Sequence, residues 1–387
     1  MSKKLLFVVT EDWYLVSHRL PLAIAAQQAG FKVSVATRLV KHQHIITEHG
    51  LQVIPFNMER RGLDPLHLIH EIYSLVSILR RERPDIIHLV ALRPVIVGGI
   101  ATYLAGISNV VFALTGMGFL FTDGGRLPWI RKTIQKSLPW LLSQGLTIVQ
   151  NQDDAEQLIS FGLPKNRLRL IPGSGVDVKH FVPGIQSIET APDTIDSLPI
   201  PILPIPISIP IVMMASRLLW DKGLAEFIAA AKILQNQHCR FVLVGTIDND
   251  NPASASEDDI KGWIAAKIIE WWGHSTDMAT VLSQADIVCL PSYREGLPKV
   301  LLEAMACGKP CITTDVPGCR AAVTHQDNGL LVPVKDATAL ATAIKQLLDD
   351  LEQRHRLGIR GRERAVNEFS QERIIEKTLA VYQEVMA

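Results

Sequence analysis

The stretch IVCLPSYREGLPKVLLEAMACGKPCIT, residues Ile287–Thr313, decides the fold class. It opens with a short apolar run typical of a buried strand, Ile287–Leu290, and passes through a Gly-Leu-Pro turn. An apolar helical pattern, Pro298–Cys307, follows, and a second strand-like run starts at Cys311. Two strands joined by a crossover helix indicate a parallel sheet.

The same alternation of strands and helices runs through the rest of the chain. Helical patterns such as His18–Ala29, Leu66–Arg81, Leu224–Gln235, Met278–Gln284 and Ala337–Leu351 separate strand-like runs. The other expected strands are Leu5–Val9, Lys32–Ala36, Gln52–Pro55, Ile86–Val90, Val110–Leu114, Thr147–Val149, Ile211–Ala215, Phe241–Val244 and Ile268–Trp271. The sequence therefore predicts an α/β protein with two Rossmann-like, doubly wound domains that face each other across a cleft.

A proline-rich segment separates the two halves. Residues 197–216 read SLPIPILPIPISIPIVMMAS and carry no charge, but five prolines between Pro199 and Pro210 exclude a regular membrane-spanning helix. We expect one domain at 1–190, an extended linker at 191–210 and a second domain at 211–368. A last helix at 369–387 is expected to pack back on the first domain.

Composition excludes several classes of protein. The 387 residues carry 39 Lys+Arg and 39 Asp+Glu, and this balance does not fit a nucleic-acid binder. Five cysteines, an odd number, fit a reduced cytoplasm better than a disulfide framework. The N-terminal apolar stretch is followed by acidic residues rather than a cleavage site, which favours a core strand over a signal peptide.

Charged residues follow the strands of the second half. Ligands of such sheets bind beyond the carboxyl ends of the strands, where Arg217, Lys222 and Glu295 are expected. Free N–H groups at the helix start after Gly296 form an anion site that suits a diphosphate. Glu303, farther along this helix, can accept two hydrogen bonds from the hydroxyls of a ribose. Glu295, before the turn, can reach the group beyond the phosphates.

The Arg-x4-Lys of Arg217 and Lys222 and the Glu-x7-Glu of Glu295 and Glu303 resemble those of the retaining glycosyltransferases of family 4, which have the GT-B fold. Further matching pieces are Ile171–Asp177, Phe181, Pro183, Phe241–Gly245, Asp277, Ala285-Asp286 and Ala304–Pro310. The resemblance implies that Arg217 and Lys222 bind the diphosphate, Glu303 the ribose and Glu295 the donor sugar.

The same resemblance implies further donor-binding residues, and the chain departs from the family pattern at two places. It implies that the backbone at Gly296, Leu297 and Pro298 meets sugar and phosphate, and we place Gly273 with these donor-binding residues. The chain departs from the family pattern at Ser174, where many relatives carry Asn, and at Leu114-Thr115-Gly116, where some members carry a histidine that contacts the donor sugar.

Several stretches are similar to bacterial enzymes that add N-acetylgalactosamine to undecaprenyl-diphosphate-linked bacillosamine. These stretches are Ala215–Gly223, Phe241–Ser256 and Pro291–Pro298. The similarity implies a UDP-sugar donor, in particular a UDP-N-acetylhexosamine, and a lipid-linked or glycan acceptor. It bears on the class of substrate; the sugar, the linkage and the oligomeric state stay open.

The first half is expected to hold the acceptor. Asp12 and His18 follow the first strand, and Thr115 and Gly116 follow the fifth, so we place all four on the acceptor side of the cleft. His18 is also a catalytic candidate, with Glu295, Arg217 and Lys222, although it could equally cap or pack the helix for which Ser17 is the expected N-cap. The glycine-rich loop at 115–125 suits an adaptable acceptor loop or ordinary turns. No Gly-x-Gly-x-x-Gly is present, which disfavours a dinucleotide cofactor.

A basic and aromatic segment suggests contact with a membrane. Residues 124–145, GGRLPWIRKTIQKSLPWLLSQG, interleave Arg126, Arg131, Lys132 and Lys136 with tryptophan and leucine. This pattern fits peripheral docking on the inner face of the cytoplasmic membrane, and it also fits an amphipathic helix packed on the sheet.

No cofactor or catalytic metal is expected. Asp248-Asn249-Asp250 could hold a metal, but Arg217 and Lys222 already neutralise phosphate, and the histidines lack metal-ligand spacing. The retaining family implies front-face attack in which the leaving phosphate takes the acceptor proton. Two alternatives stay open: a sugar-nucleotide epimerase, which needs no acceptor, and a non-catalytic binding protein, which turns nothing over.

Overall fold

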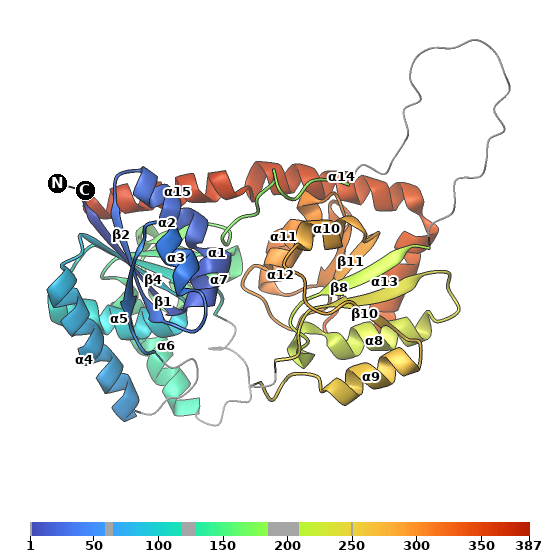
Figure 1. The fold of residues 1–387 in the computed structure, drawn as a ribbon, viewed down its shortest axis with the longest axis horizontal. Helices are drawn as coiled ribbons and strands as arrows, with labels where there is room; N and C mark the ends of the chain where they lie inside the picture. The colour runs from blue at the N-terminus through green and yellow to red at the C-terminus, as the bar shows by residue number, and fades with distance from the viewer. Residues whose placement is uncertain (1, 59–64, 118–127, 185–208, 249–250) are drawn as a thin grey trace, which may run out of the picture.

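The structure is a computed structural model that describes residues 2–58, 65–117, 128–184, 209–248 and 251–387. Two α/β domains lie side by side, and each contains one parallel sheet with helices on both faces (Figure 1). The predicted fold class, two Rossmann-like domains, is confirmed.

The first domain is built on a seven-stranded sheet with the order β3-β2-β1-β4-β5-β6-β7. Its strands are β1 Lys4–Glu11, β2 Lys32–Arg38, β3 Gln52–Pro55, β4 Ile86–Val90, β5 Val110–Leu114, β6 Leu146–Val149 and β7 Leu168–Leu170. Its helices are α1 Asp12–His18, α2 Leu20–Gln28, α3 Gln43–Glu48, α4 Pro65–Glu82, α5 Leu92–Ala105, α6 Pro128–Leu142 and α7 Gln152–Ser160. The order changes direction at β1, so the carboxyl ends of β1 and β4 open a crevice at that edge.

The second domain repeats this plan with six strands in the order β10-β9-β8-β11-β12-β13. The strands are β8 Ile211–Ala215, β9 Arg240–Val244, β10 Glu270–Trp271, β11 Ile287–Leu290, β12 Cys311–Thr314 and β13 Gly329–Val332. The helices are α8 Leu224–Ile233, α9 Glu257–Ala265, α10 Met278–Ser283, α11 Lys299–Ala306, α12 Pro317–Ala322, α13 Ala337–Asp349 and α14 Leu351–Glu368, and a last helix, α15 Gln371–Met386, follows them in the chain. The quoted strand–helix–strand stretch is therefore β11, α11 and β12, with β11 and β12 paired in parallel.

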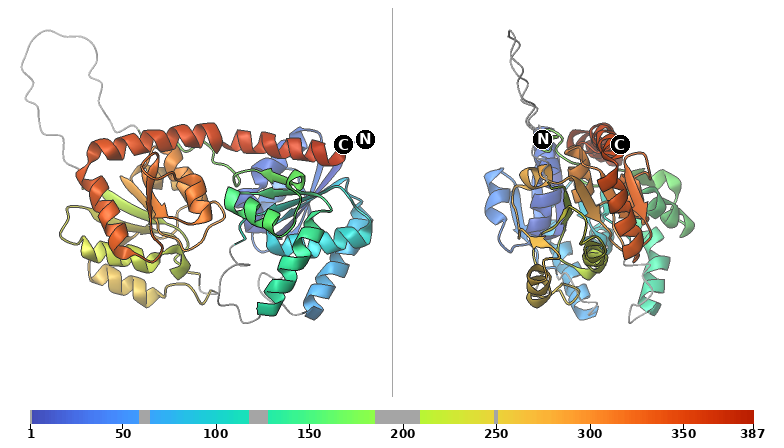
Figure 2. Two further views of the ribbon diagram at one scale, coloured as in Figure 1. Left: turned by 180° about the vertical axis from the view of Figure 1, so that it is seen from behind. Right: turned by 90° about the vertical axis from the view of Figure 1, so that its right-hand side faces the viewer.

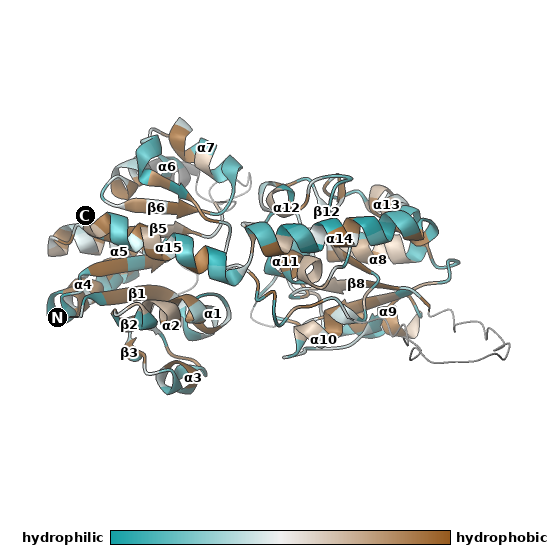
Figure 3. Cartoon of the chain, turned by 90° about the horizontal axis from the view of Figure 1, so that it is seen from above, coloured by the Kyte–Doolittle hydropathy of each residue, from teal (hydrophilic) through white to brown (hydrophobic). Residues whose placement is uncertain are grey.

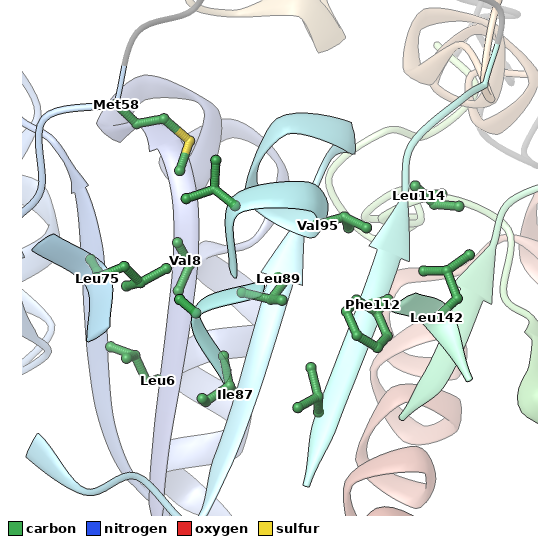
Figure 4. Close-up of a cluster of buried hydrophobic side chains, with 14 of the residues drawn as sticks. Leu6, Val8, Met58, Leu75, Ile87, Leu89, Val95, Phe112, Leu114 and Leu142 are labelled. Carbon is green, nitrogen blue, oxygen red and sulfur yellow. The ribbon is translucent and has the colours of Figure 1, made fainter. Parts of the chain in front are cut away.

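Each sheet has an apolar layer on both faces. In the first domain, Val8, Leu89 and Phe112 from three neighbouring strands are fully buried and pack together with residues of α4, α5 and α6 (Figure 4). Burial of one such side chain stabilises the fold by about 1.5–3 kcal/mol. These layers fix the strands, and the strands fix the loops that follow them.

The last two helices run along one side of both domains, as two opposite views show (Figures 1 and 2). Helix α14 packs on α11 of the second domain, and α15 packs on α2, β4 and β5 of the first. The α15 contact contains a buried polar pair, because the Tyr382 hydroxyl lies 2.6 Å from His88 Nδ1. Figure 3 views the molecule from the side of α14 and α15. In this view α14 is mostly hydrophilic, whereas the strands beneath it are hydrophobic.

Three details of the predicted elements are wrong. Ser17 is not an N-cap, because the segment forms two short helices. The N-cap of the second helix is Arg19, and Pro21 lies in its first turn. Strand β10 has only two residues instead of the predicted Ile268–Trp271. The helix predicted at Ala337–Leu351 ends earlier, because Asp350 starts α14 by accepting a hydrogen bond from the Gln353 N–H.

Several predictions fall on residues outside the described part of the chain. They are the linker at 191–208, the loop at 118–125, Arg126, Asn249 and Asp250. Within the described part, none of the helices combines the length and the apolar character needed to cross a bilayer.

Candidate active site

A cleft of about 600 Å³ lies between the two domains. Residues of both domains line it, and several of them directly follow strands, as the rule for parallel sheets predicts. His18 and Thr115 of the first domain face it, as do Arg217, Lys222, Glu295, Gly296, Leu297, Pro298 and Glu303 of the second. Nine of the predicted site residues are thus brought together.

The loop after β8 carries both predicted phosphate-binding cations. Arg217 Nη1 lies 3.2 Å from Asp248 Oδ2, in the loop after β9. Lys222 Nζ lies 2.5 Å from Glu295 Oε1, and the Ser292 hydroxyl donates to the same oxygen at 2.8 Å. In the structure each of these cations therefore has a carboxylate partner.

The turn before α11 is held between the domains. A Cβ atom at Gly296 would lie 1.9 Å from the carbonyl oxygen of Thr115, so only glycine fits there. The Gly296 carbonyl accepts a hydrogen bond of 3.0 Å from Asn151 Nδ2 of the first domain. Gly116 lies outside the cleft lining, but its own Cβ would come within 3.0 Å of Gly296 Cα. The close neighbour that requires glycine at position 296 is thus the backbone of the opposite domain.

Glu303 is a buried carboxylate, with 7% of its surface exposed. Burial raises the pKa of its carboxyl, and the Lys299 cation, 3.3 Å away, opposes that shift. Lys299 Nζ also donates to the Ser17 carbonyl oxygen at 3.2 Å, across the cleft. Lys299 therefore joins the helix that carries Glu303 to the first domain.

His18 is held neutral beside the cleft. Its ring stacks on Tyr14 with centroids 4.4 Å apart, and Nδ1 lies 2.6 Å from the Ser17 hydroxyl. Burial, followed by the nearby cations Lys299 and Arg19, lowers the pKa of His18 from about 6.5 to about 3. A histidine with so low a pKa is a weak base, and it can still donate or accept a hydrogen bond.

Asp12 and Gly273 do not line the cleft. Asp12 is fully buried and accepts hydrogen bonds from the backbone N–H groups of residues 13, 40, 41 and 42. Burial alone would raise the pKa of this carboxyl, but these donors outweigh burial and hold the pKa below its usual value. The predicted acceptor contact of Asp12 is therefore replaced by a structural role. Gly273 accepts a hydrogen bond from the Gly245 N–H at 2.7 Å, and its neighbours His274 and Ser275 face the cleft.

The polar residues that sequence reasoning missed include Arg19, Gln150 and Lys299 in the cleft lining, and Asp248 as the partner of Arg217. Lys299 carried a signal, because a lysine four residues before Glu303 lies on the same face of the helix. Among the described residues, no group of three or more His, Cys, Asp or Glu side chains could hold a metal ion.

Comparison with known proteins then identifies the chain. Residues 201–364 match the family model for glycosyl transferases group 1, and residues 4–143 match that for glycosyl transferase 4-like domains. The chain therefore carries a glycosyl transferase 4-like domain followed by a glycosyl transferases group 1 domain. This glycosyltransferase is 29% identical to the N,N'-diacetylbacillosaminyl-diphospho-undecaprenol alpha-1,3-N-acetylgalactosaminyltransferase of Campylobacter jejuni, over 95% of each chain. It is 28% identical to the UDP-Gal:alpha-D-GlcNAc-diphosphoundecaprenol alpha-1,3-galactosyltransferase of Escherichia coli, over 74% of this chain and 72% of that one.

Solved structures of glycosyltransferases share the whole fold. The crystal structure of a glycosyltransferase from Rickettsia africae superposes with a TM-score of 0.78 at 18% identity and covers 100% of this glycosyltransferase and 99% of that chain. Anabaena HepE in complex with UDP-glucose superposes with a TM-score of 0.72 at 20% identity, over 97% and 99% of the two chains. These structures confirm the predicted GT-B fold, and the family models confirm the resemblance to family 4 glycosyltransferases.

Proposed function

We propose that this protein transfers a sugar from a UDP-sugar to a lipid-linked or glycan acceptor during assembly of a bacterial surface polysaccharide or glycan. The observation that carries the proposal is the cleft, in which two cations and two carboxylates of one domain face His18 and Thr115 of the other. The relatives from Campylobacter jejuni and Escherichia coli, by their names, both act on sugars carried by diphosphate-linked undecaprenol. The first of them supports an N-acetylhexosamine as the transferred sugar.

The donor roles follow from the ion pairs of the second domain. A diphosphate competes with Asp248 for Arg217 and with Glu295 for Lys222, because it offers more negative charge to both cations. Release from Lys222 leaves Glu295 free to accept hydrogen bonds from the hydroxyls of the donor sugar. Glu303, already buried at the cleft wall, accepts from the ribose.

Chemistry at the anomeric carbon then needs stabilisation of the leaving phosphate. Arg217, Lys222 and the N–H groups at the start of α11 supply fixed positive charge where negative charge develops. His18, with its pKa near 3, is a poor acceptor for the proton of the attacking hydroxyl. We infer that the leaving phosphate takes this proton, that His18 orients a substrate by hydrogen bonding, and that configuration is retained by front-face attack without a metal or other cofactor.

Peripheral attachment to the inner face of the cytoplasmic membrane supplies the lipid-linked acceptor. Lys132 and Lys136 of α6 are exposed, and Trp140 of the same helix is 53% exposed. Trp140 lies edge-on to Tyr103 of α5, with ring centroids 5.4 Å apart. Exposed cations beside amphipathic rings suit an anionic lipid surface.

One assay separates this proposal from its two alternatives. The purified protein is incubated with labelled UDP-sugars, with and without bacterial lipid extract, and the label is measured in the lipid phase. Transfer predicts label in the lipid phase only when both substrates are present. An epimerase would convert the UDP-sugar without the extract, and a binding protein would leave it unchanged.

Attachment is tested by sedimentation with vesicles that contain anionic lipid. Each basic residue near such a surface contributes about 1 kcal/mol, and salt screens this attraction. We expect sedimentation at low salt, partial release at 1 M salt, and loss of sedimentation when Arg131, Lys132 and Lys136 are replaced by glutamine. UDP binding serves as the control, since its proposed residues lie in the other domain. Parent-like sedimentation of the triple variant would reject this docking surface.

A further inference from the structure

Four arginine and lysine side chains of the described residues line the cleft: Arg19, Arg217, Lys222 and Lys299. Three of them have a carboxylate partner within the second domain. The pairs are Arg217 with Asp248 at 3.2 Å, Lys222 with Glu295 at 2.5 Å and Lys299 with Glu303 at 3.3 Å. Arg19, the one cation from the first domain, has no such partner among the described residues.

Arg19 is also deeply buried, with 4% of its surface exposed. Its Nε is buried without a hydrogen-bond partner. Among the described residues, none forms an ion pair or a hydrogen bond with the rest of its guanidinium. A buried and uncompensated charge is strongly unfavourable in a protein. Within the described part of the chain, the arrangement is therefore that of a cation whose counter-ion a bound substrate would supply.

The position of Arg19 indicates which substrate supplies that counter-ion. Arg19 connects α1 to α2, and together with His18 and Ser174 it lines both the cleft and a small void toward α15. Trp13, Tyr14 and His18 line the same side of the cleft, and their rings offer flat surfaces to a sugar. The cations proposed for the donor diphosphate lie in the opposite domain. Arg19 is therefore placed to bind a second anionic group, on the acceptor side of the cleft.

We propose that Arg19 binds the phosphate or diphosphate through which the acceptor sugar is attached to its carrier. The inference rests on the proposed function, because it assigns the acceptor of that reaction to a phosphorylated sugar. The planar guanidinium is suited to phosphate, since it donates two parallel hydrogen bonds. Arg19 is then a residue that selects phosphorylated acceptors over free glycosides.

The binding test uses geranyl diphosphate, a short-chain carrier phosphate, and geraniol, which lacks the phosphates. Each is titrated calorimetrically into the protein saturated with UDP, so that the donor phosphates are already in place. We expect the parent to bind geranyl diphosphate more tightly than geraniol, and Arg19→Gln to weaken geranyl diphosphate binding about 10–100-fold. Arg19→Lys, which keeps the charge, should lose less.

Two controls make the result specific. Lys41→Gln removes one positive charge from an exposed site of the same domain and should bind geranyl diphosphate like the parent. The affinity of Arg19→Gln for UDP should stay within about twofold of the parent value, which also shows that the variant is folded. With lipid extract, KM for the acceptor should rise by a similar factor while kcat changes little.

Four results would overturn the inference. An equal loss of UDP affinity in Arg19→Gln would assign Arg19 to the donor phosphates. Parent-like affinity of Arg19→Gln for geranyl diphosphate would show that Arg19 does not bind the phosphate. Equal binding of geranyl diphosphate and geraniol to the parent would show the same, and this comparison requires no variant. If the parent transfers sugar to lipid extract but Arg19→Gln keeps the same acceptor KM, this inference fails and the proposed function stands.

Discussion

Replacing Glu303 with glutamine tests the ribose assignment. The side chain is 7% exposed, and glutamine preserves its volume, so the core around α11 is expected to stay packed. The ion pair with Lys299 is lost, but Lys299 keeps 35% of its side chain exposed and remains solvated. A hydrogen bond to a charged group contributes about 1.5–3 kcal/mol. We therefore expect UDP to bind about 10–100-fold more weakly, while the melting temperature changes little.

Calorimetric titration of UDP measures this loss, and a second nucleotide locates its cause. With 2′,3′-dideoxy-UDP, which lacks both ribose hydroxyls, the parent should already bind weakly, and Glu303→Gln should add little further loss. Glu257→Ala is the matched control, because Glu257 forms an exposed ion pair with Lys261 on α9 and does not line the cleft. The assignment would be refuted by unchanged UDP affinity, or by the same loss with both nucleotides.

Three further predictions concern charge, metal and pH. Arg217→Ala and Lys222→Ala should each weaken UDP about 10–100-fold and leave uridine binding unchanged, and equal binding of uridine and UDP to the parent would contradict the diphosphate site. Transfer should persist in EDTA, whereas loss of activity with rescue by manganese would direct attention to Asp248 and Asp250. His18 has a pKa of about 3 in the folded protein and near 6.5 when unfolded, so between these values the unfolded chain binds the extra proton. Stability should therefore fall as the pH drops from 6.5 toward 3, more steeply in the parent than in His18→Gln, and parallel thermal melting curves for the two proteins would contradict the neutral histidine.

The sequence predicted most of the fold, because the apolar patterns of strands and helices can be recognised within short stretches of the chain. Runs such as Ile287–Leu290 and the helix after Pro298 appear where they were expected, and the residues after them reach the cleft because parallel strands end at one edge. For that reason, the sequence alone was enough to select four residues as candidates for the site: Arg217, Lys222, Glu295 and Glu303.

Pairings across the cleft were not predictable from the sequence, because they depend on how the domains approach each other. The contact of Gly296 with Thr115 joins residues far apart in the chain, and so does the Lys299 hydrogen bond to the Ser17 carbonyl. Asp12 was misplaced for a related reason, since its backbone partners at 40–42 come from the loop after β2. The lack of a partner for Arg19 among the described residues also depends on where segments distant in the sequence lie, so it could be found only in the structure.

The most direct test of transfer in this cleft compares the parent with Glu295→Gln in one measurement: lipid-phase label formed from a labelled UDP-sugar and lipid extract. Glu295 pairs with Lys222 in the structure and is proposed to contact the donor sugar. Its replacement should therefore reduce transfer by about 100-fold or more. The affinity for UDP should not fall, because Lys222 stays available to the phosphates. Label in the lipid phase from the parent and its loss in the variant is the predicted result, and equal label from both proteins, or none from the parent, would contradict the account.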